Sequence, residues 1–247
     1  MIIHQIYGLF KDNKPMNELF STGSTKWREY CDRNGHIYKL WNAEEVEELV
    51  NTYTNIKEYF YDVKYPVMKV DIARFLIIYS FGGMYVDLDV LPNKNMIEID
   101  ETKLYLCNYL WTPQGHLQDK TVADIEIIHS PKYNIDLFNF IAFYVPSQIE
   151  EKNKIEIYEQ WKIRYIFQTT GPVSFRRFMK KNKIIYENID TLGLPKSVKI
   201  NDNIDIENDY GNLDYDCLSY FSLSYNPHGN KNMKYKKYEK KNKCLTE

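Results

Sequence analysis

The segment from Lys69 to Pro92, KVDIARFLIIYSFGGMYVDLDVLP, constrains the fold of this chain more than any other. Between Val70 and Phe81 almost every residue is apolar, so this stretch has no polar side to turn toward water. Pro66 precedes it and Gly82-Gly83 follows it, as is typical of the first turn and the C-terminal end of a helix. The pattern predicts a helix over 67–81. A helix that is apolar on all sides lies inside the protein.

Two charges interrupt this predicted helix, Asp71 and Arg74. Residues three positions apart lie on the same side of a helix. Burying either charge without a partner costs several kcal/mol, so the two must pair or face a cleft. The residues alone leave both readings open: a structural buried ion pair, or a carboxylate and a guanidinium presented to a polar ligand.

A strand is predicted over 84–91, stopped by Pro92. Alternation along a strand places Tyr85, Asp87 and Asp89 on one face and leaves the other face to apolar core residues. The two carboxylates would then stand about 7 Å apart, and like charges at that distance repel unless a cation lies near them. Carboxylate oxygens suit magnesium or manganese, which also gather substrate phosphates. The pattern therefore predicts a divalent cation site.

The rest of the chain alternates between strands and helices, which indicates an α/β architecture. Asn42 and Glu45 have the spacing of a capping box for a helix that begins at Ala43. The further predicted strands cover 2–7, 37–41 and 104–110, and the further predicted helices cover 15–34, 136–145 and 173–180.

These motifs resemble the glycosyltransferase family named for its DXD-containing sugar-binding region. That family includes initiating α-1,6-mannosyltransferases and capsular polysaccharide transferases, and is related to the catalytic domains of clostridial glucosylating toxins. The resemblance is carried by Asp71-Ile-Ala-Arg74, Gly82-Gly83-Met-Tyr85, Asp87-Leu-Asp89 and Pro92, by IHQIYG at 3–8, by YKLW at 38–41 and by Thr170-Gly171-Pro172.

The resemblance implies one GT-A-type, Rossmann-like domain over 1–230, with a mixed central sheet flanked by helices. It also implies a retaining hexosyltransferase that uses manganese or magnesium. The donor would be a UDP-sugar or GDP-sugar, and the acceptor a hydroxyl of a glycan or a protein.

The resemblance further assigns roles to single residues. Tyr7 would stack on the nucleobase, and Tyr85 would line the donor site. Asp71 and Arg74 would contact the donor sugar and its ribose or phosphate. Asp87 would bind ribose or sugar hydroxyls and assist the metal, and Asp89 would ligate the metal directly. Asp71, Arg74, Asp87 and Asp89 are the expected catalytic residues.

The chain departs from the family pattern near its end. Family members carry a His or Glu followed by a Ser-Trp pair that completes the metal site, and this chain has no such pair. His228 and Asn232 are the nearest candidates for the remaining metal ligand. His4, by contrast, is expected to be a structural or surface group.

Three other functions fit parts of the pattern. A catalytically inactive relative would bind a nucleotide sugar or glycan without turnover. A nucleotidyltransferase would use paired aspartates and a metal but release pyrophosphate. A glycoside hydrolase would place two carboxylates on either side of the scissile bond, although it has no need for the Asp71–Arg74 pair.

Charge and composition limit the partners. A net charge of -2 and a pI near 6.2 argue against nucleic acid. The four cysteines, scattered and without a CxxC pair, indicate a reducing compartment. The first residues do not form a signal peptide, so we expect a cytoplasmic protein, in a host cytoplasm if its origin is viral or a toxin. The lysine-rich tail, 231–247, is either a solvated terminus or a weak contact with an anionic membrane surface.

Overall fold

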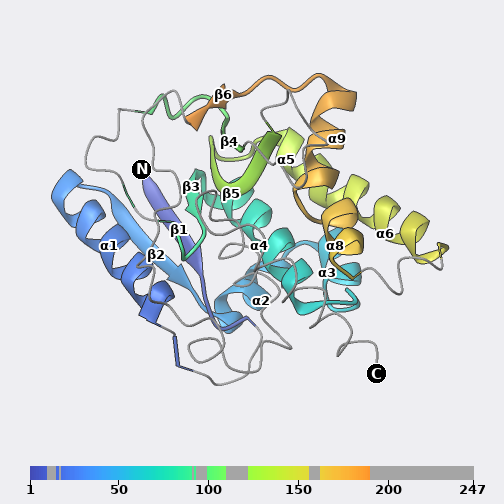
Figure 1. Ribbon diagram of the computed structural model, residues 1–247, viewed down its shortest axis with the longest axis horizontal. Helices are drawn as coiled ribbons and strands as arrows, with labels where there is room; N and C mark the ends of the chain where they lie inside the picture. The colour runs from blue at the N-terminus through green and yellow to red at the C-terminus, as the bar shows by residue number, and fades with distance from the viewer. Residues whose placement is uncertain are drawn as a thin grey trace, which may run out of the picture.

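The computed structural model describes residues 1–9, 15–16, 18–90, 92, 99–109, 122–155 and 162–189. Within them the chain forms a six-stranded sheet with strand order β2-β1-β3-β5-β4-β6 (Figure 1). Strand β1 is parallel to β2 and β3, β5 is antiparallel to β3 and β4, and β4 is parallel to β6. The strands are β1 (Ile2–Ile6), β2 (Ile37–Trp41), β3 (Gly83–Val86), β4 (Tyr105–Tyr109), β5 (Val122–Ser130) and β6 (Glu187–Asn188).

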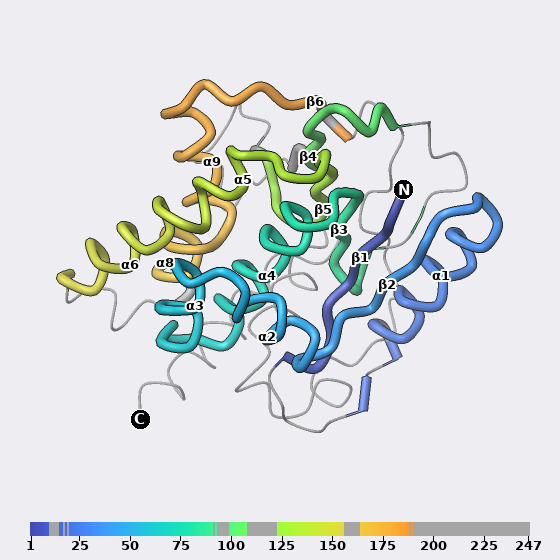
Figure 2. Tube along the Cα trace, turned by 180° about the vertical axis from the view of Figure 1, so that it is seen from behind, coloured from blue at the N-terminus to red at the C-terminus, as the bar shows by residue number. Residues whose placement is uncertain are grey.

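Helices cover the sheet, which confirms the expected α/β class with a mixed central sheet. Figures 1 and 2 both show α1 alongside β2, with α6, α8 and α9 at the far end of the molecule. Among the described residues, none of the helices is both long enough and apolar enough to cross a membrane. The helices are α1 (Glu18–Asn34), α2 (Ala43–Asn51), α3 (Thr54–Phe60), α4 (Pro66–Phe81), α5 (Ile135–Asn139), η1 (Phe140–Tyr144), α6 (Val145–Asn153), α8 (Lys162–Thr169) and α9 (Pro172–Asn182).

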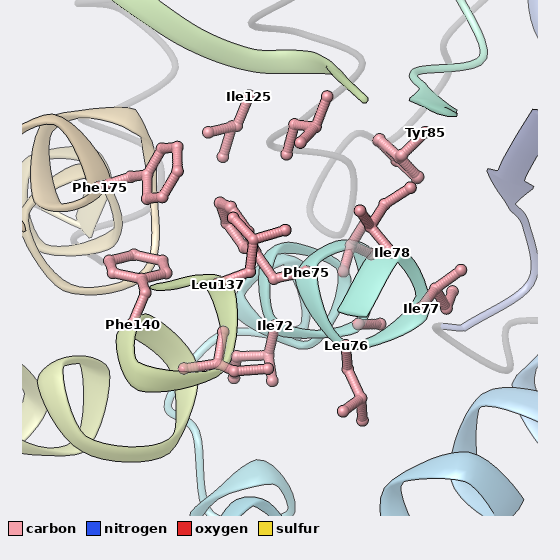
Figure 3. Packing of buried hydrophobic residues seen from close by; sticks show 14 of the residues in the cluster. Ile72, Phe75, Leu76, Ile77, Ile78, Tyr85, Ile125, Leu137, Phe140 and Phe175 are labelled. Carbon is pink, nitrogen blue, oxygen red and sulfur yellow. The ribbon is translucent and has the colours of Figure 1, made fainter. Parts of the chain in front are cut away.

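The apolar helix α4 forms the centre of the larger core, as its sequence predicts. Figure 3 shows Phe75 of α4 facing Phe140 of η1 and Phe175 of α9, with ring centroids 4.9 and 4.7 Å away. Burial of each such side chain contributes about 1.5–3 kcal/mol to stability. A second cluster lies under α1, where Trp27 packs with Ile3, Met84 and Val86.

The Gly82-Gly83 pair turns the chain from α4 into β3. Both glycines have positive φ, 68° and 86°. A Cβ on Gly83 would lie 2.3 Å from the Ile2 carbonyl oxygen of β1, so only glycine allows β3 to begin so close to its neighbour. This close approach brings the end of α4 and the start of β3 against the first strand.

Several sequence predictions hold, and two need correction. The capping box at Asn42 and Glu45 is present, and α4 and α9 begin within one residue of their predicted starts. The strand predicted over 84–91 ends at Val86, because a hydrogen bond from Val90 N to Asp87 O (3.1 Å) closes a turn. The helix predicted over 136–145 continues through a π-helical stretch to Asn153.

The sequence did not predict α3, β5, α8 or β6. The expected domain end at 230 and the tail 231–247 lie outside the described residues.

Candidate active site

The candidate site lies at the carboxyl edge of the parallel strands. Tyr7 follows β1, Trp41 ends β2 and Asp87 follows β3, so the three positions share one edge of the sheet. The Tyr7 amide donates to the Trp41 carbonyl oxygen (2.9 Å) and keeps the first two strand ends together. Open α/β sheets bind ligands at this edge. The topology thus places Tyr7 and Asp87, which the resemblance assigns to the donor site, at the same edge of the sheet.

Arg74 joins three elements around the site. Its Nη1 donates to the Ile125 carbonyl oxygen of β5 (2.8 Å) and lies 3.3 Å from Asp87 Oδ1. Its Nη2 lies 3.2 Å from Asp71 Oδ1, and the guanidinium is 4.9 Å from the centre of the Tyr85 ring. The side chain is 1% exposed. The i, i+3 spacing therefore did predict a pair on one face of α4.

This guanidinium is not fully satisfied by the protein. Within the described part of the chain, Nε and Nη2 of Arg74 have no aligned hydrogen-bond partner, although both are buried. The short distance from Nη2 to Asp71 is an ion-pair contact whose geometry does not make a hydrogen bond. A buried unsatisfied donor costs about 1–3 kcal/mol. A ligand oxygen within hydrogen-bond distance of either group would remove that cost.

Asp71 is held on both sides. Its Oδ1 faces Arg74, and its Oδ2 accepts a 2.8 Å hydrogen bond from Thr170 Oγ1. Thr170 precedes Gly171-Pro172, where α9 begins, so the TGP element meets the α4 pair. Burial raises the pKa of Asp71 to about 6, opposed by Arg74 and Thr170. Both oxygens have protein partners, so the contacts of Asp71 serve to hold Arg74.

Asp87 and Asp89 lie in the turn after β3 rather than along the strand. Asp87 Oδ1 accepts from the Tyr85 hydroxyl (2.7 Å) and faces Arg74. Among the described residues, these contacts all go to Oδ1, which leaves Oδ2 for a ligand. Burial raises the pKa of Asp87, and Arg74 lowers it. Asp89 is 7% exposed. The alternation argument that gave a spacing of about 7 Å does not apply to a turn.

Two further acids, Asp124 and Glu126 of β5, belong to the surroundings of the site. Burial raises the pKa of Asp124 to about 6, and it raises the pKa of Glu126 well above its usual range. The charges of Asp87 and Arg74 act on both groups. Sequence reasoning missed them, although the alternation of acids with Ala123, Ile125 and Ile127 in VADIEIIHS is a strand signal.

The donor set fits a divalent cation only in part. Asp87 and Asp89 supply hard oxygen atoms, which magnesium and manganese prefer. Across the residues that the structure describes, no group of three or more His, Cys, Asp or Glu side chains is arranged to hold a metal. His228 and Asn232, the expected additional ligands, lie outside the described residues.

His4 of β1 connects the end of β2 with the residue that precedes β3. It is 1% exposed. Trp41 Nε1 lies 3.1 Å from His4 Nδ1, and His4 Nε2 lies 2.9 Å from the Gly82 carbonyl oxygen. Because the indole can only donate, Nδ1 accepts and Nε2 carries the proton. Burial lowers the pKa of His4 to about 4. The ring is a neutral structural bridge, which is the first of the two alternatives that the sequence left open for it.

Comparison with known proteins agrees with this geometry. The family described as "Glycosyltransferase sugar-binding region containing DXD motif" matches residues 9–106. Residues 9–106 are therefore similar to a DXD-type glycosyltransferase region, and we refer to them as the glycosyltransferase region. The glycosyltransferase region contains α4 and the turn after β3, and therefore Asp71, Arg74, Asp87 and Asp89. Tyr7 and Thr170 lie outside it.

Two curated relatives are mannosyltransferases of Schizosaccharomyces pombe. The chain is 33% identical over 96 residues to inositol phosphoceramide mannosyltransferase 1, covering 38% of this chain and 29% of that protein. It is 33% identical over 60 residues to inositol phosphoceramide mannosyltransferase 3, covering 24% and 17%. The matched segments thus span less than a third of either relative.

One solved structure similar to this chain is that of the PaToxG glycosyltransferase. It shares 13% sequence identity with a TM-score of 0.48, over 73% of this chain and 69% of that one.

Proposed function

We propose that this protein is a metal-dependent, retaining glycosyltransferase that moves a hexose from a nucleoside-diphosphate sugar to an acceptor hydroxyl of a glycan or protein. The observation that carries this proposal is the buried Arg74 with unsatisfied N–H groups, placed between Asp71 and Asp87 inside the glycosyltransferase region. It is a cationic group held ready for an oxygen-rich ligand at the edge of the sheet where such ligands bind.

In the proposed reaction, negative charge builds on the diphosphate oxygens as the bond from the sugar C1 breaks. Arg74 would stabilise that charge from a fixed position, because Asp71, Asp87 and the Ile125 carbonyl hold its guanidinium before the donor binds. Asp87 would also bind a donor hydroxyl through Oδ2, and Tyr7 would stack on the base. A divalent cation, held by Asp89 with the help of Asp87, would supply further charge neutralisation as a Lewis acid.

Retention of configuration would follow if the acceptor hydroxyl attacks the sugar C1 on the same face from which the diphosphate leaves. The departing phosphate oxygen would then take the proton of the acceptor hydroxyl. The names of the two Schizosaccharomyces pombe relatives favour mannose, and hence GDP-mannose, among the UDP-sugar and GDP-sugar donors.

The proposal is tested by incubating the purified full-length protein with UDP- and GDP-sugars, with and without manganese, and measuring released nucleoside diphosphate. Manganese-dependent release from one donor supports the transferase. Release of pyrophosphate instead would indicate a nucleotidyltransferase.

A second candidate is a nucleotide-sugar-binding protein without turnover. It is favoured by one observation, the lack of a three-ligand metal set among the described residues. Thermal shift with UDP or GDP plus manganese separates the two when no turnover is seen. Binding without turnover supports the second candidate, and absence of both overturns the donor site.

A further inference from the structure

The turn from Asp87 to Val90 is held from behind by contacts to its backbone carbonyl groups. The Asp87 carbonyl oxygen accepts from Gln5 Nε2 (3.2 Å) as well as from Val90 N. The Val90 carbonyl oxygen accepts from Trp27 Nε1 (2.7 Å). Asp89 lies between these two anchored residues.

Helix α1 also approaches the turn directly. A Cβ on Gly23 would lie 1.8 Å from the Leu88 carbonyl oxygen, so any side chain at this position would push the turn away. Gly23 and Trp27 are four residues apart on α1, and Ser24 and Trp27 are three apart, so all three lie on one face of the helix. That face of α1 sets where the backbone of the turn can lie.

A series of partly buried hydrogen bonds adds a second connection from α1 to the same turn. Ser24 Oγ lies 2.7 Å from the Tyr38 hydroxyl, which donates to Gln5 Oε1 (2.8 Å), and Gln5 Nε2 donates to the Asp87 carbonyl. Reversing the Gln5 amide would put its oxygen against the Asp87 carbonyl oxygen, so its orientation is fixed. Since Tyr38 gives its proton to Gln5, Ser24 must donate to Tyr38. All three hydrogen bonds therefore point the same way, from α1 through β2 and β1 to the turn.

We propose that Ser24, Tyr38 and Gln5 are positioning residues. Together with the face of α1 that contacts the turn, they orient the Asp89 carboxylate toward the cation and the diphosphate of the donor. This inference rests on the proposed function. An aspartate has a short side chain, so its reach is decided by where its backbone lies. Displacement of a catalytic group by about 1 Å can cost roughly a hundredfold in rate.

A purely structural role predicts a different result. Loss of the Tyr38 hydroxyl leaves Gln5 Oε1 without its donor and so lowers stability by the cost of one hydrogen bond, while the packing of Trp27 and its apolar neighbours keeps the region folded. The same loss should weaken the response to the metal, because Asp89 would be less well placed. The decisive readout is the manganese concentration that gives half-maximal donor hydrolysis, compared with the melting temperature of the metal-free protein.

The test compares Tyr38→Phe with Tyr30→Phe. Both remove one phenolic hydroxyl, and among the described residues the Tyr30 hydroxyl has no hydrogen-bond partner, although its ring packs edge-on against Trp27. Tyr38→Phe should raise the manganese concentration for half-maximal rate by about fivefold, the equivalent of one neutral hydrogen bond. Tyr30→Phe should leave it unchanged. Both variants should stay folded at the assay temperature, which their melting temperatures will show.

Ser24→Ala provides an independent check. It should raise the manganese requirement less than Tyr38→Phe does, and adding it to Tyr38→Phe should have no further effect, because Ser24 acts only through Tyr38. An unchanged manganese requirement in Tyr38→Phe, or additive effects in the double variant, would overturn the positioning role while the transferase stands. A wild-type protein with neither turnover nor manganese-dependent nucleotide binding would overturn the proposed function and this inference with it.

Discussion

Thr170 donates a hydrogen bond to Asp71 across 99 positions of the sequence. The bond connects the start of α9 to the middle of α4, and Asp71 in turn faces Arg74. The TGP element is therefore part of the support of the guanidinium, and the strength of that support can be measured.

Thr170→Val should lower activity and shift its pH dependence. The substitution keeps the shape but removes a hydrogen bond that lowers the pKa of Asp71, which burial has already raised to about 6. The pKa of Asp71 should therefore rise further, and the acidic limb of the kcat/KM profile should move to higher pH. The loss of a hydrogen bond to a buried carboxylate should cost about 1.5–3 kcal/mol of stability.

Thr169→Val is the matched control for that experiment. Its hydroxyl donates to the Tyr165 carbonyl within α8 and does not reach Asp71. The acidic limb should stay in place in this variant. Equal shifts in the two variants would mean that Thr170 acts only through general stability.

Asp89→Asn should lower the rate of metal-dependent turnover by roughly a hundredfold or more, since loss of one charge-stabilising group in an active site lowers kcat by that factor. The substitution keeps the size of the side chain, so the variant should remain folded, which its melting temperature will show. Asp62→Asn, at an exposed aspartate, is the control and should behave as wild type. Retention of full manganese-dependent turnover in Asp89→Asn would remove Asp89 from the metal site.

Arg74→Met should destabilise the fold by about 3–5 kcal/mol at neutral pH, because it leaves Asp71 and Asp87 buried without their cation. The pH dependence has a defined sign. Burial already raises the pKa values of both carboxyls, and loss of Arg74 raises them further. Protonation relieves the penalty, so urea unfolding should show a smaller deficit at pH 5 than at pH 7.5. A deficit independent of pH would contradict buried charge as the cause.

Arg177→Met serves as the control for that series. Arg177 is exposed on α9, so its loss should change stability by less than about 0.5 kcal/mol at either pH.

His4 should make the protein sensitive to mild acid. Its pKa is about 4 in the fold against 6.5 in the unfolded chain, so between these values the unfolded state binds a proton that the folded state does not. Stability from this group is complete above pH 6.5 and is lost toward pH 4, at up to about 1.4 kcal/mol per pH unit. His4→Gln should flatten the stability curve in this window, whereas His36→Gln, at a partly exposed histidine, should change it less. A curve of unchanged slope in His4→Gln would contradict the neutral bridge.

Local signals predicted the parts of the fold that depend on neighbouring residues. The proline and glycine around α4 and the capping box of α2 act within one or two turns of the chain, so their sequence spacing suffices. The end of β3 could not be predicted in this way. It depends on Trp27 and Gly23 of α1, more than 60 positions away, which hold the turn that begins at Asp87.

In the candidate site, too, contacts between neighbouring residues could be predicted and contacts between distant segments could not. The i, i+3 spacing of Asp71 and Arg74 predicted their pairing, because both lie on one helix. Asp124 and Glu126 reach the site only through the pairing of β5 with β3, which their own segment does not reveal. The contact of Thr170 with Asp71 likewise depends on how α9 packs against α4.

The strand order has a consequence for anyone who would express the glycosyltransferase region alone. Strand β3 pairs with β1 on one side and β5 on the other, and both neighbours fall outside residues 9–106. A fragment cut at those limits would expose both edges of the strand that leads into Asp87, and unpaired edges invite intermolecular pairing. Such a fragment should precipitate rather than fold, so the glycosyltransferase region is not expected to fold on its own. Any shorter version of this protein must keep residues 1–9 and 122–130.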